Sequence, residues 1–551
     1  MGRWWNSDRV TTFGLVCKGS LAAGSVAALL LMAACGDKEE GQAGSGNAAE
    51  TVAAIDPAQA PIIQKAIDDY LLLAEGPAEQ RVLHHAAIKV TPGSDAFDVA
   101  IEGVRIGPKD QGQLDIGTIG YKLTPKGTDG YTASNLTHAN IFTAKDKDGK
   151  ETGSVTLATK AFSGEWSSSL QTFLALDWQA ADIVAKDSAP DGGNFSAKTL
   201  STSLASTDKG GGLFDQSGRF QLTGFSAQDT NGGTFNLGQL DFSGLMTAVK
   251  LKEYVAKTRE MQNLMAEIAE ATAKAEAAAG NAATNGTATE AAAPAGINPA
   301  QAAKFGEMIK SMSGLIGGLK YDGSFTEAGF KEKDGSEPFH LGLGAFTMAF
   351  DGLDKDKAAV NLGLSHDKLV IKDPDLAGDP LFAKLLPASG KLDLNLTDVP
   401  SKELWQLVGD NFPNLIAGDP AHSEAAAGIM FVAMQQLLQK APMKLTVAPS
   451  GLTSEVMQLD ATGNFDVKPD ATLGLVGALD VALHGLDEAM KLANEAAQTS
   501  PNAAQIVGGL AMIQSMAKRE TGSDGKPVDK LKLEVDAAGD TKVNGMPLSG
   551  M

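Results

Sequence analysis

The feature that most restricts the fold of this chain is a series of short segments in which apolar and polar residues alternate, separated by turn-forming residues. The clearest segments are Phe97–Ile106, Leu114–Leu123, Phe173–Trp178, Phe220–Phe225 and Phe235–Phe242. Successive side chains of a strand point to opposite faces of its sheet, so this alternation is typical of strands with one buried face. The stretch from about Val82 to Leu245 is therefore predicted to form antiparallel strands.

Three other segments repeat apolar residues every three to four positions, which is typical of amphipathic helices. The first follows Asp56 and Pro57, residue types favoured at the N-cap and the first position of a helix. The second begins at Leu251, and the third follows Asn298 and Pro299. Residues 280–296 between the last two are rich in Ala, Gly, Asn and Thr, which predicts a linker that cannot pack a core.

Similar segments recur in the same order along the chain. Their separations are 242, 239 and 239 residues for IDPAQA and INPAQA (from Ile55 and Ile297), for Thr-Gly (at Thr223 and Thr462), and for GQLDFSGLMTAVKL and GALDVALHGLDEAMKL (from Gly238 and Gly477). A single match in an alanine-rich chain could arise by chance, but three near-equal separations predict an internal duplication. A weaker match pairs FTAKDKDGKE with FKEKDGSE, and it requires two compensating insertions.

These elements together predict an α+β fold with two related halves, each a curved antiparallel sheet flanked by amphipathic helices. The predicted boundaries run along the chain as follows: a leader at 1–34, a flexible tether at 35–54, the first half at 55–279, the linker at 280–296 and the second half at 297–551.

The leader has the parts of a secretory signal peptide. Its first 20 residues carry three basic residues against the single acid Asp8, and Leu21–Ala34 is uncharged and mostly apolar. That apolar run has 14 residues. A membrane-spanning helix needs about 20, so a cleaved signal is favoured over a permanent span.

The residues Met32-Ala33-Ala34-Cys35 resemble the lipobox of bacterial lipoproteins, with Met32 in place of the usual leucine. The resemblance implies a lipid on Cys35, cleavage before it, palmitate among the acyl chains, and a location in a Gram-negative cell envelope, facing the periplasm. Either the inner or the outer membrane would fit. The alternative is an ordinary secretory cleavage site with an incidental cysteine. The other cysteine, Cys17, lies in the leader, so the mature chain is predicted to contain no disulfide.

Charge restricts the partners. The chain has 46 basic and 67 acidic residues and a formal net charge of −21, and removal of the basic leader leaves about −23. Binding to nucleic acid, or docking on anionic lipid by charge alone, requires basic patches. Both are therefore excluded, and membrane attachment is expected through N-terminal acyl chains.

Motifs for catalysis, metals and cofactors are missing from the sequence. The seven histidines form no HxH or HExxH pattern, and there is no GxSxG, no P-loop and no GxGxxG after a strand. The DKDG sequence at Asp146 places Ala144 and Val155 at the first and twelfth positions of an EF-hand loop, where carboxylates are required, so a hairpin turn is predicted instead. No catalytic, cofactor-binding or metal-binding residue is predicted.

The lipobox, the strand-rich halves, the Leu-Asp pairs at Leu240 and Leu479 and the closing VNGMPL at Val543 resemble uncharacterised bacterial envelope proteins of the YdgA type and, more widely, AsmA-like proteins. AsmA-like proteins are associated with outer-membrane homeostasis and with lipid movement through an apolar β-groove. The resemblance is best from about Tyr321 to Met551. It implies no site residue, and this chain has a lipobox where those proteins have a transmembrane anchor.

The expected function is therefore that of a non-catalytic, lipid-anchored envelope protein that holds a lipid or another apolar envelope molecule in a β-groove. Two alternatives stay open. One is an interaction scaffold for envelope assembly, with an envelope protein as partner. The other is a hydrolase with a dispersed carboxylate or Ser/His site.

Overall fold

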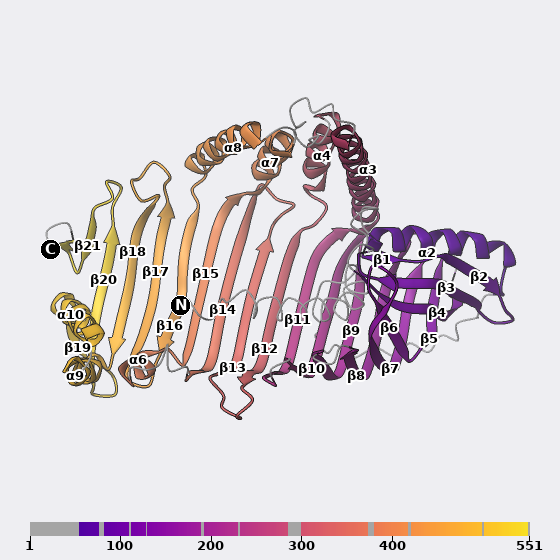
Figure 1. The fold of residues 1–551 in the computed structure, drawn as a ribbon. Coiled ribbons are helices and arrows are strands. Elements are labelled where there is room, and N and C mark those ends of the chain that lie inside the picture. The colour runs from indigo at the N-terminus through magenta and orange to yellow at the C-terminus, as the bar shows by residue number, and fades with distance from the viewer. Residues whose placement is uncertain are drawn as a thin grey trace. The chain divides into compact units, whose positions relative to one another are not determined.

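The computed structural model describes residues 54–75, 82–108, 112–127, 129–188, 192–229, 232–284, 299–372, 380–416, 420–498 and 501–548 (Figure 1). Antiparallel strands make up most of this part of the chain, and helices flank them. The α+β prediction is confirmed. Cys35, the leader and nearly all of the tether lie outside the described residues, as does most of the predicted linker.

The chain divides into two compact units that are each discontinuous in sequence. Unit 1 consists of residues up to 232, 240–321 and 405–431, and unit 2 of residues 233–239, 322–404 and 432–551. The third predicted helix, α4 (Pro299–Met312), belongs to unit 1.

The sheet of unit 1 begins with β2, β3 and β4 as neighbours, and β1 pairs with the far end of β3. Strand β4 pairs with both β5 and β6, and each of these pairs with β7. Strands β7, β8, β9 and β10 then follow as successive antiparallel neighbours. The strands are β1 (Leu83–His84), β2 (Ala87–Pro92), β3 (Phe97–Ile106), β4 (Gln113–Lys126), β5 (Gly130–Thr137), β6 (Ile141–Lys145), β7 (Glu151–Ser167), β8 (Thr172–Asp187), β9 (Asn194–Gly210) and β10 (Leu213–Gln228).

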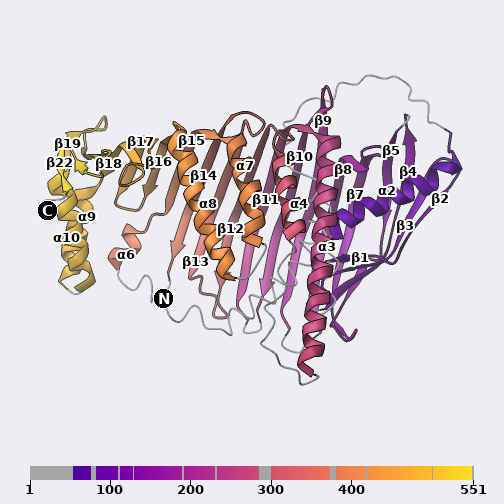
Figure 2. The ribbon, with the colours of Figure 1, turned by 90° about the horizontal axis from the view of Figure 1, so that it is seen from above.

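Helix α2 (Ala60–Glu75) lies across this sheet and closes its core (Figures 1 and 2). The predicted cap is confirmed: the Asp56 side chain accepts a hydrogen bond from the backbone N–H of Ala58, and the short 3₁₀ turn Pro57–Gln59 leads into the helix. Ile63 and Ile67 of α2 are fully buried against strand residues, Phe97 among them. The apolar stripe of α2 therefore forms one wall of the unit 1 core.

Replacing Ile63 by alanine is expected to destabilise unit 1 by about 2–5 kcal/mol, the usual cost of a cavity at a buried isoleucine. Ile63 is 0% exposed, whereas its neighbour Ile62 on the same helix is 53% exposed. Ile62→Ala is the matched control and should change stability by less than about 0.5 kcal/mol. Urea unfolding followed by the fluorescence of Trp166 and Trp178 measures both. Equal effects of the two variants would contradict this packing.

Tight turns with Asp-Gly join several strands, as the sequence predicts. The carboxylate of Asp146 accepts hydrogen bonds from the backbone N–H groups of Asp148 and Lys150, and Gly149 has φ of 81°. Gly335 and Gly525 take the same left-handed conformation, at 85° and 79°. A side chain at these positions would be strained, which explains the glycines. The turn interpretation of DKDG is confirmed.

Strand β11 (Thr234–Lys250) continues without a break into α3 (Leu251–Thr284), the second predicted helix. Leu251 and Leu264 are buried, whereas Met265 is 40% exposed. Within unit 1, α4 packs on residues of α7 (Ser401–Ile416): the rings of Phe305 and Phe412 stack 5.3 Å apart.

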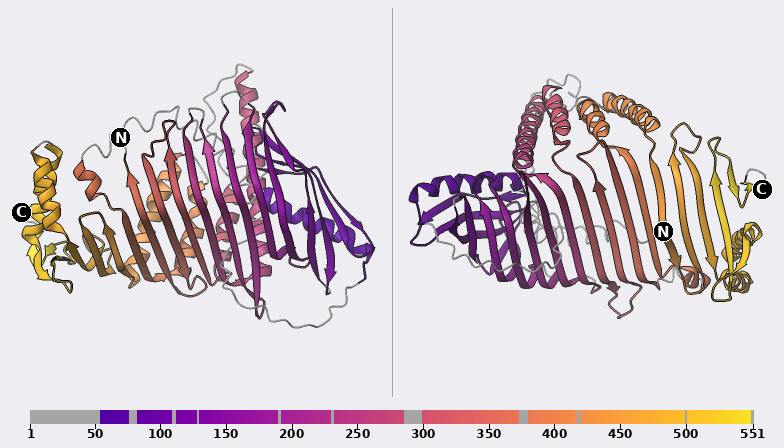
Figure 3. Two further views of the ribbon diagram at one scale, coloured as in Figure 1. Left: turned by 90° about the horizontal axis from the view of Figure 1, so that it is seen from below. Right: turned by 180° about the vertical axis from the view of Figure 1, so that it is seen from behind.

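Unit 2 is built from successive antiparallel strands from β13 to β18, followed by β20 (Figure 3). Helices α9 and α10 pack on each other through a small cluster that contains Leu486, Ala489 and Ala493 (Figure 2). The bounds are β12 (Gly318–Lys331), β13 (Phe339–Asp351), β14 (Lys357–Ile371), α6 (Pro380–Leu385), β15 (Ser389–Pro400), α8 (Pro420–Lys440), β16 (Lys444–Thr453), β17 (Gln458–Val467), β18 (Leu475–His484), α9 (Leu486–Ala497), α10 (Pro501–Met516), β19 (Lys518–Thr521), β20 (Pro527–Val535), β21 (Thr541–Val543) and β22 (Met546–Pro547).

The segments matched by the predicted duplication lie in elements of the same type. Thr223 and Thr462 lie in strands β10 and β17, and the two longer segments run from β11 into α3 and from β18 into α9. The strands between them differ in number and pairing. The duplication therefore stays a prediction.

Candidate ligand-binding groove

The sheet of unit 2 has one apolar and one polar face. Cross-strand partners follow one another in register across the sheet. On the apolar face, one row is Phe346, Leu364 and Leu392, and the next is Met348, Leu362, Leu394, Val447, Gly463 and Leu479. Because side chains alternate between faces, all of these point to the same side.

The other face carries amides, hydroxyls and carboxylates. Asn361 donates a hydrogen bond to the Asp393 carboxylate at 3.1 Å, and Thr446 donates to Asn464 at 3.0 Å. Both bonds join neighbouring strands. This face is suited to water, so the sheet does not need a second layer of structure to cover it.

A groove of about 670 Å³ opens on the apolar face. We call it the leucine groove, and its walls are formed by side chains of β13 to β18 together with Phe325 of β12. Its volume falls in the range of about 300–1,000 Å³ typical of small-molecule sites. The main apolar side chains that line it are Phe325, Phe346, Leu364, Leu392, Leu394, Val447, Leu452, Leu459 and Leu479.

The leucines of the groove are accessible from solvent. Leu364, Leu392 and Leu452 are 45%, 38% and 43% exposed. Single exposed leucines are common on protein surfaces, whereas larger contiguous apolar patches are typical of binding surfaces. Leu364 and Leu392 are direct register partners, which makes the row contiguous.

The few polar groups of the groove include Ser450, His366 and Lys391. The Ser450 hydroxyl donates to the carbonyl of Ala448 at 2.8 Å and accepts from the backbone N–H of Asp393 at 3.0 Å, so its hydrogen bonds are made within the sheet. His366 lies between Gly344 and Gly390 in register, and its Nδ1 is buried without a partner among the described residues. Lys391 lies 3.7 Å from the Asp393 carboxylate. The walls of the groove are therefore largely apolar.

Two glycines shape the groove. A Cβ at Gly344 would overlap the Phe325 ring, so the absence of a side chain lets that ring lie against strand β13. A Cβ at Gly390 would lie 2.6 Å from Nε2 of His366 and 2.8 Å from Leu452. Glycine at these two positions lets neighbouring side chains approach the backbone closely and leaves the bottom of the groove free of a side chain.

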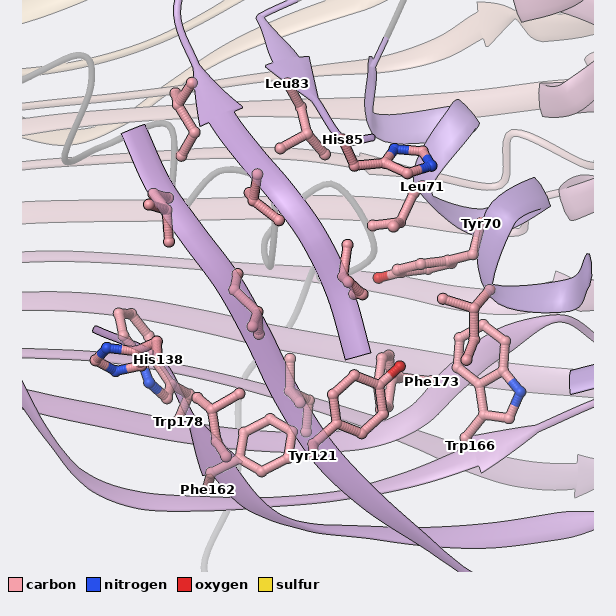
Figure 4. A pocket seen from close by; sticks show the side chains of 18 of the residues that line it. Tyr70, Leu71, Leu83, His85, Tyr121, His138, Phe162, Trp166, Phe173 and Trp178 are labelled. Atoms are coloured by element: carbon pink, nitrogen blue, oxygen red, sulfur yellow. The ribbon is translucent and has the colours of Figure 1, made fainter. Parts of the chain in front are cut away.

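Unit 1 encloses a second apolar hollow between α2 and its sheet (Figure 4). Its volume of about 160 Å³ is a quarter of that of the groove. Trp166 and Trp178 are buried at 2% and 3% exposure and line this cavity. The Trp166 ring makes edge contacts with Tyr70 and Phe173 at 5.1 and 5.0 Å between centroids.

Two adjacent histidines in one strand would point to opposite faces, which predicts one buried and one solvated ring for His84 and His85, but strand β1 ends at His84. His84 is 9% exposed, and the side chain of His85 is 12% exposed because its Nε2 lies 3.1 Å from the Asp68 carboxylate of α2. The Nε2 atom of His84 lies 3.2 Å from the carbonyl oxygen of Gly107, so each ring has a contact from another segment of the chain, which alternation within one strand cannot reveal. In the part of the chain that the structure describes, no three metal-ligating side chains gather into a metal site.

No family model, curated protein or solved structure matches this chain. Sequence reasoning missed the residues of the leucine groove, although one signal was present: alternating apolar residues in three consecutive segments, FTMAF, VNLGL and LDLNL, that begin at Phe346, Val360 and Leu392.

Proposed function

We propose that this protein is a non-catalytic, lipid-anchored component of a bacterial cell envelope that holds the acyl chains of a lipid in the leucine groove. The observation that carries the proposal is the groove itself: about 670 Å³, open to solvent and lined by leucine and phenylalanine side chains. Each methylene group of an acyl chain transferred from water to such a surface contributes about 0.8 kcal/mol. A long chain therefore has a large driving force to enter.

The lipobox-like sequence at Cys35 supports a lipid as the occupant. A chain anchored by acyl groups works beside a membrane, where lipids are the most abundant apolar molecules. None of the described helices combines the length and the apolar composition that a membrane span requires. The proposed attachment is through acyl chains at Cys35, on the side of the membrane that faces the periplasm.

An interaction scaffold is the second candidate, and one observation favours it. Helix α8 exposes Ile429 and Phe431 at 63% and 70%. Such side chains on a helix surface are typical of residues that a protein partner covers. In this case the leucine groove would also be occupied by a segment of an envelope protein and not by lipid.

Native mass spectrometry of the Cys35→Ser protein, which lacks the acyl anchor, tests the proposal. We expect copurified lipid in the spectrum and saturable uptake of a fluorescent fatty acid by the emptied protein. A captured protein in place of lipid would favour the scaffold. A spectrum without bound lipid, together with no uptake, would reject the lipid-binding function.

A further inference from the structure

The cavity of unit 1 is lined by two tyrosines whose hydroxyls have no hydrogen-bonding partner in the described part of the chain. Tyr70 reaches the cavity from α2 and Tyr121 from β4, and their hydroxyls point toward its middle (Figure 4). Among the residues that the structure describes, neither hydroxyl has a hydrogen-bonding partner. Both side chains are half-buried and line the cavity. A buried hydroxyl without a partner is costly, so such a pair calls for a ligand or water.

Both phenols are uncharged at physiological pH. Burial raises the pKa of Tyr70 to about 12. Burial, helped by the neighbouring Tyr70, also raises the pKa of Tyr121. The two hydroxyls can each donate and accept a hydrogen bond. They therefore suit a neutral polar group and offer nothing to balance a charge.

Two other polar side chains of the cavity wall, those of His138 and Trp178, have hydrogen-bonding partners. His138 uses Nδ1 to donate to the carbonyl of Ala139 at 2.7 Å, so its Nε2 accepts from the Thr159 hydroxyl at 2.7 Å. The indole of Trp178 in turn donates to Thr159 at 3.2 Å. The indole N–H of Trp166 has no partner among the described residues, but it is buried and out of reach of a ligand. His85 also lines the cavity, and its Nε2 lies 3.1 Å from the Asp68 carboxylate. Among the described residues, the hydroxyls of Tyr70 and Tyr121 are therefore the polar groups best placed to contact a ligand.

Size restricts the ligand further. The volume of about 160 Å³ is close to that of the engineered apolar cavity of about 150 Å³ that binds benzene. Aromatic rings dominate the wall, with Trp166, Phe173 and Phe162 around the two tyrosines. The shape therefore fits one ring or a short chain, and a long acyl chain is too large for it.

We propose that the unit 1 cavity is a binding site for a small uncharged amphiphile: a single ring or short apolar chain with one hydroxyl or carbonyl group held between Tyr70 and Tyr121. This site lies in the other unit from the leucine groove and does not depend on the lipid-binding function.

Calorimetric titration of the mature chain with p-cresol and with toluene tests the site. The two probes share a ring and differ by one hydroxyl. We expect p-cresol to bind about fivefold more tightly than toluene, the worth of about one hydrogen bond. Tyr70→Phe and Tyr121→Phe should each reduce that advantage while leaving toluene binding nearly unchanged.

Tyr131→Phe is the matched control, because Tyr131 is a buried tyrosine of the same unit that does not line the cavity. It should keep the preference for p-cresol. Leu364→Lys, which alters the leucine groove, should leave p-cresol binding unchanged. If neither probe binds the unmodified protein, or if both bind with equal affinity, the proposal is overturned. This outcome does not depend on whether the variants fold.

Discussion

Replacing Cys35 by serine is expected to abolish palmitate labelling and to release the protein from the membrane. The sulfur of Cys35 is the proposed attachment point, and serine offers no thiol for acylation. The chain has about −23 charges after the leader, so no electrostatic attraction to anionic lipid would hold it once the acyl chains are gone. Metabolic labelling with palmitate, followed by membrane fractionation, measures both effects.

Cys17→Ser is the matched control, because Cys17 is the only other cysteine and lies in the predicted leader. This variant should be labelled and anchored like the unmodified protein. A Cys35→Ser protein that still incorporates palmitate would refute lipidation at this residue. Loss of labelling in both variants would point to failed secretion and not to a lost acylation site.

A lysine in the leucine groove is expected to reduce uptake of a fluorescent fatty acid by roughly tenfold or more, which corresponds to a loss of at least about 1.4 kcal/mol. Leu364→Lys and Leu392→Lys each place an ammonium group among apolar side chains that line the groove. Both leucines are partly exposed, so the folded sheet can direct the charge to water when the groove is empty. An entering acyl chain would have to displace that water.

Val370→Lys is the control for this experiment. Val370 lies on the same strand as Leu364 and is 38% exposed, but it does not line the groove. The three variants should have similar thermal stability, and Val370→Lys should keep normal uptake. Unchanged uptake in both groove variants would show that the fatty acid binds elsewhere. Equal losses in all three would point to general destabilisation of the sheet.

Local features of the fold were predictable because they depend on neighbouring residues. Alternation predicted strands at Phe97–Ile106 and Leu114–Leu123, and both lie in strands of the structure. The Asp56 cap and the Asp-Gly turn at Asp148 also formed as expected. Period-2 patterns, capping residues and tight turns are determined within a few positions of the chain.

The positions of the sites were not predictable, because they depend on which strands pair and in what register. Tyr70 lies on a helix and Tyr121 on a strand, and nothing near either residue shows that their hydroxyls meet in one cavity. Met265 has the right helical spacing from Leu251 for burial, yet it is 40% exposed in the folded chain. A single-residue shift of register would turn a strand's apolar side chains to the opposite face.

The sequence by itself determined the class of fold, the positions of strands and turns, and the expectation of an acyl anchor at Cys35. Only the tertiary structure decided that unit 1 closes around a core with a small cavity, whereas the apolar face of unit 2 stays open as a groove. The physical reason is that a second element of the fold covers the apolar face of the sheet in one unit and leaves it exposed in the other. Alternation shows that a strand has an apolar face, but whether a helix such as α2 covers that face or leaves it exposed depends on contacts between residues far apart in the chain.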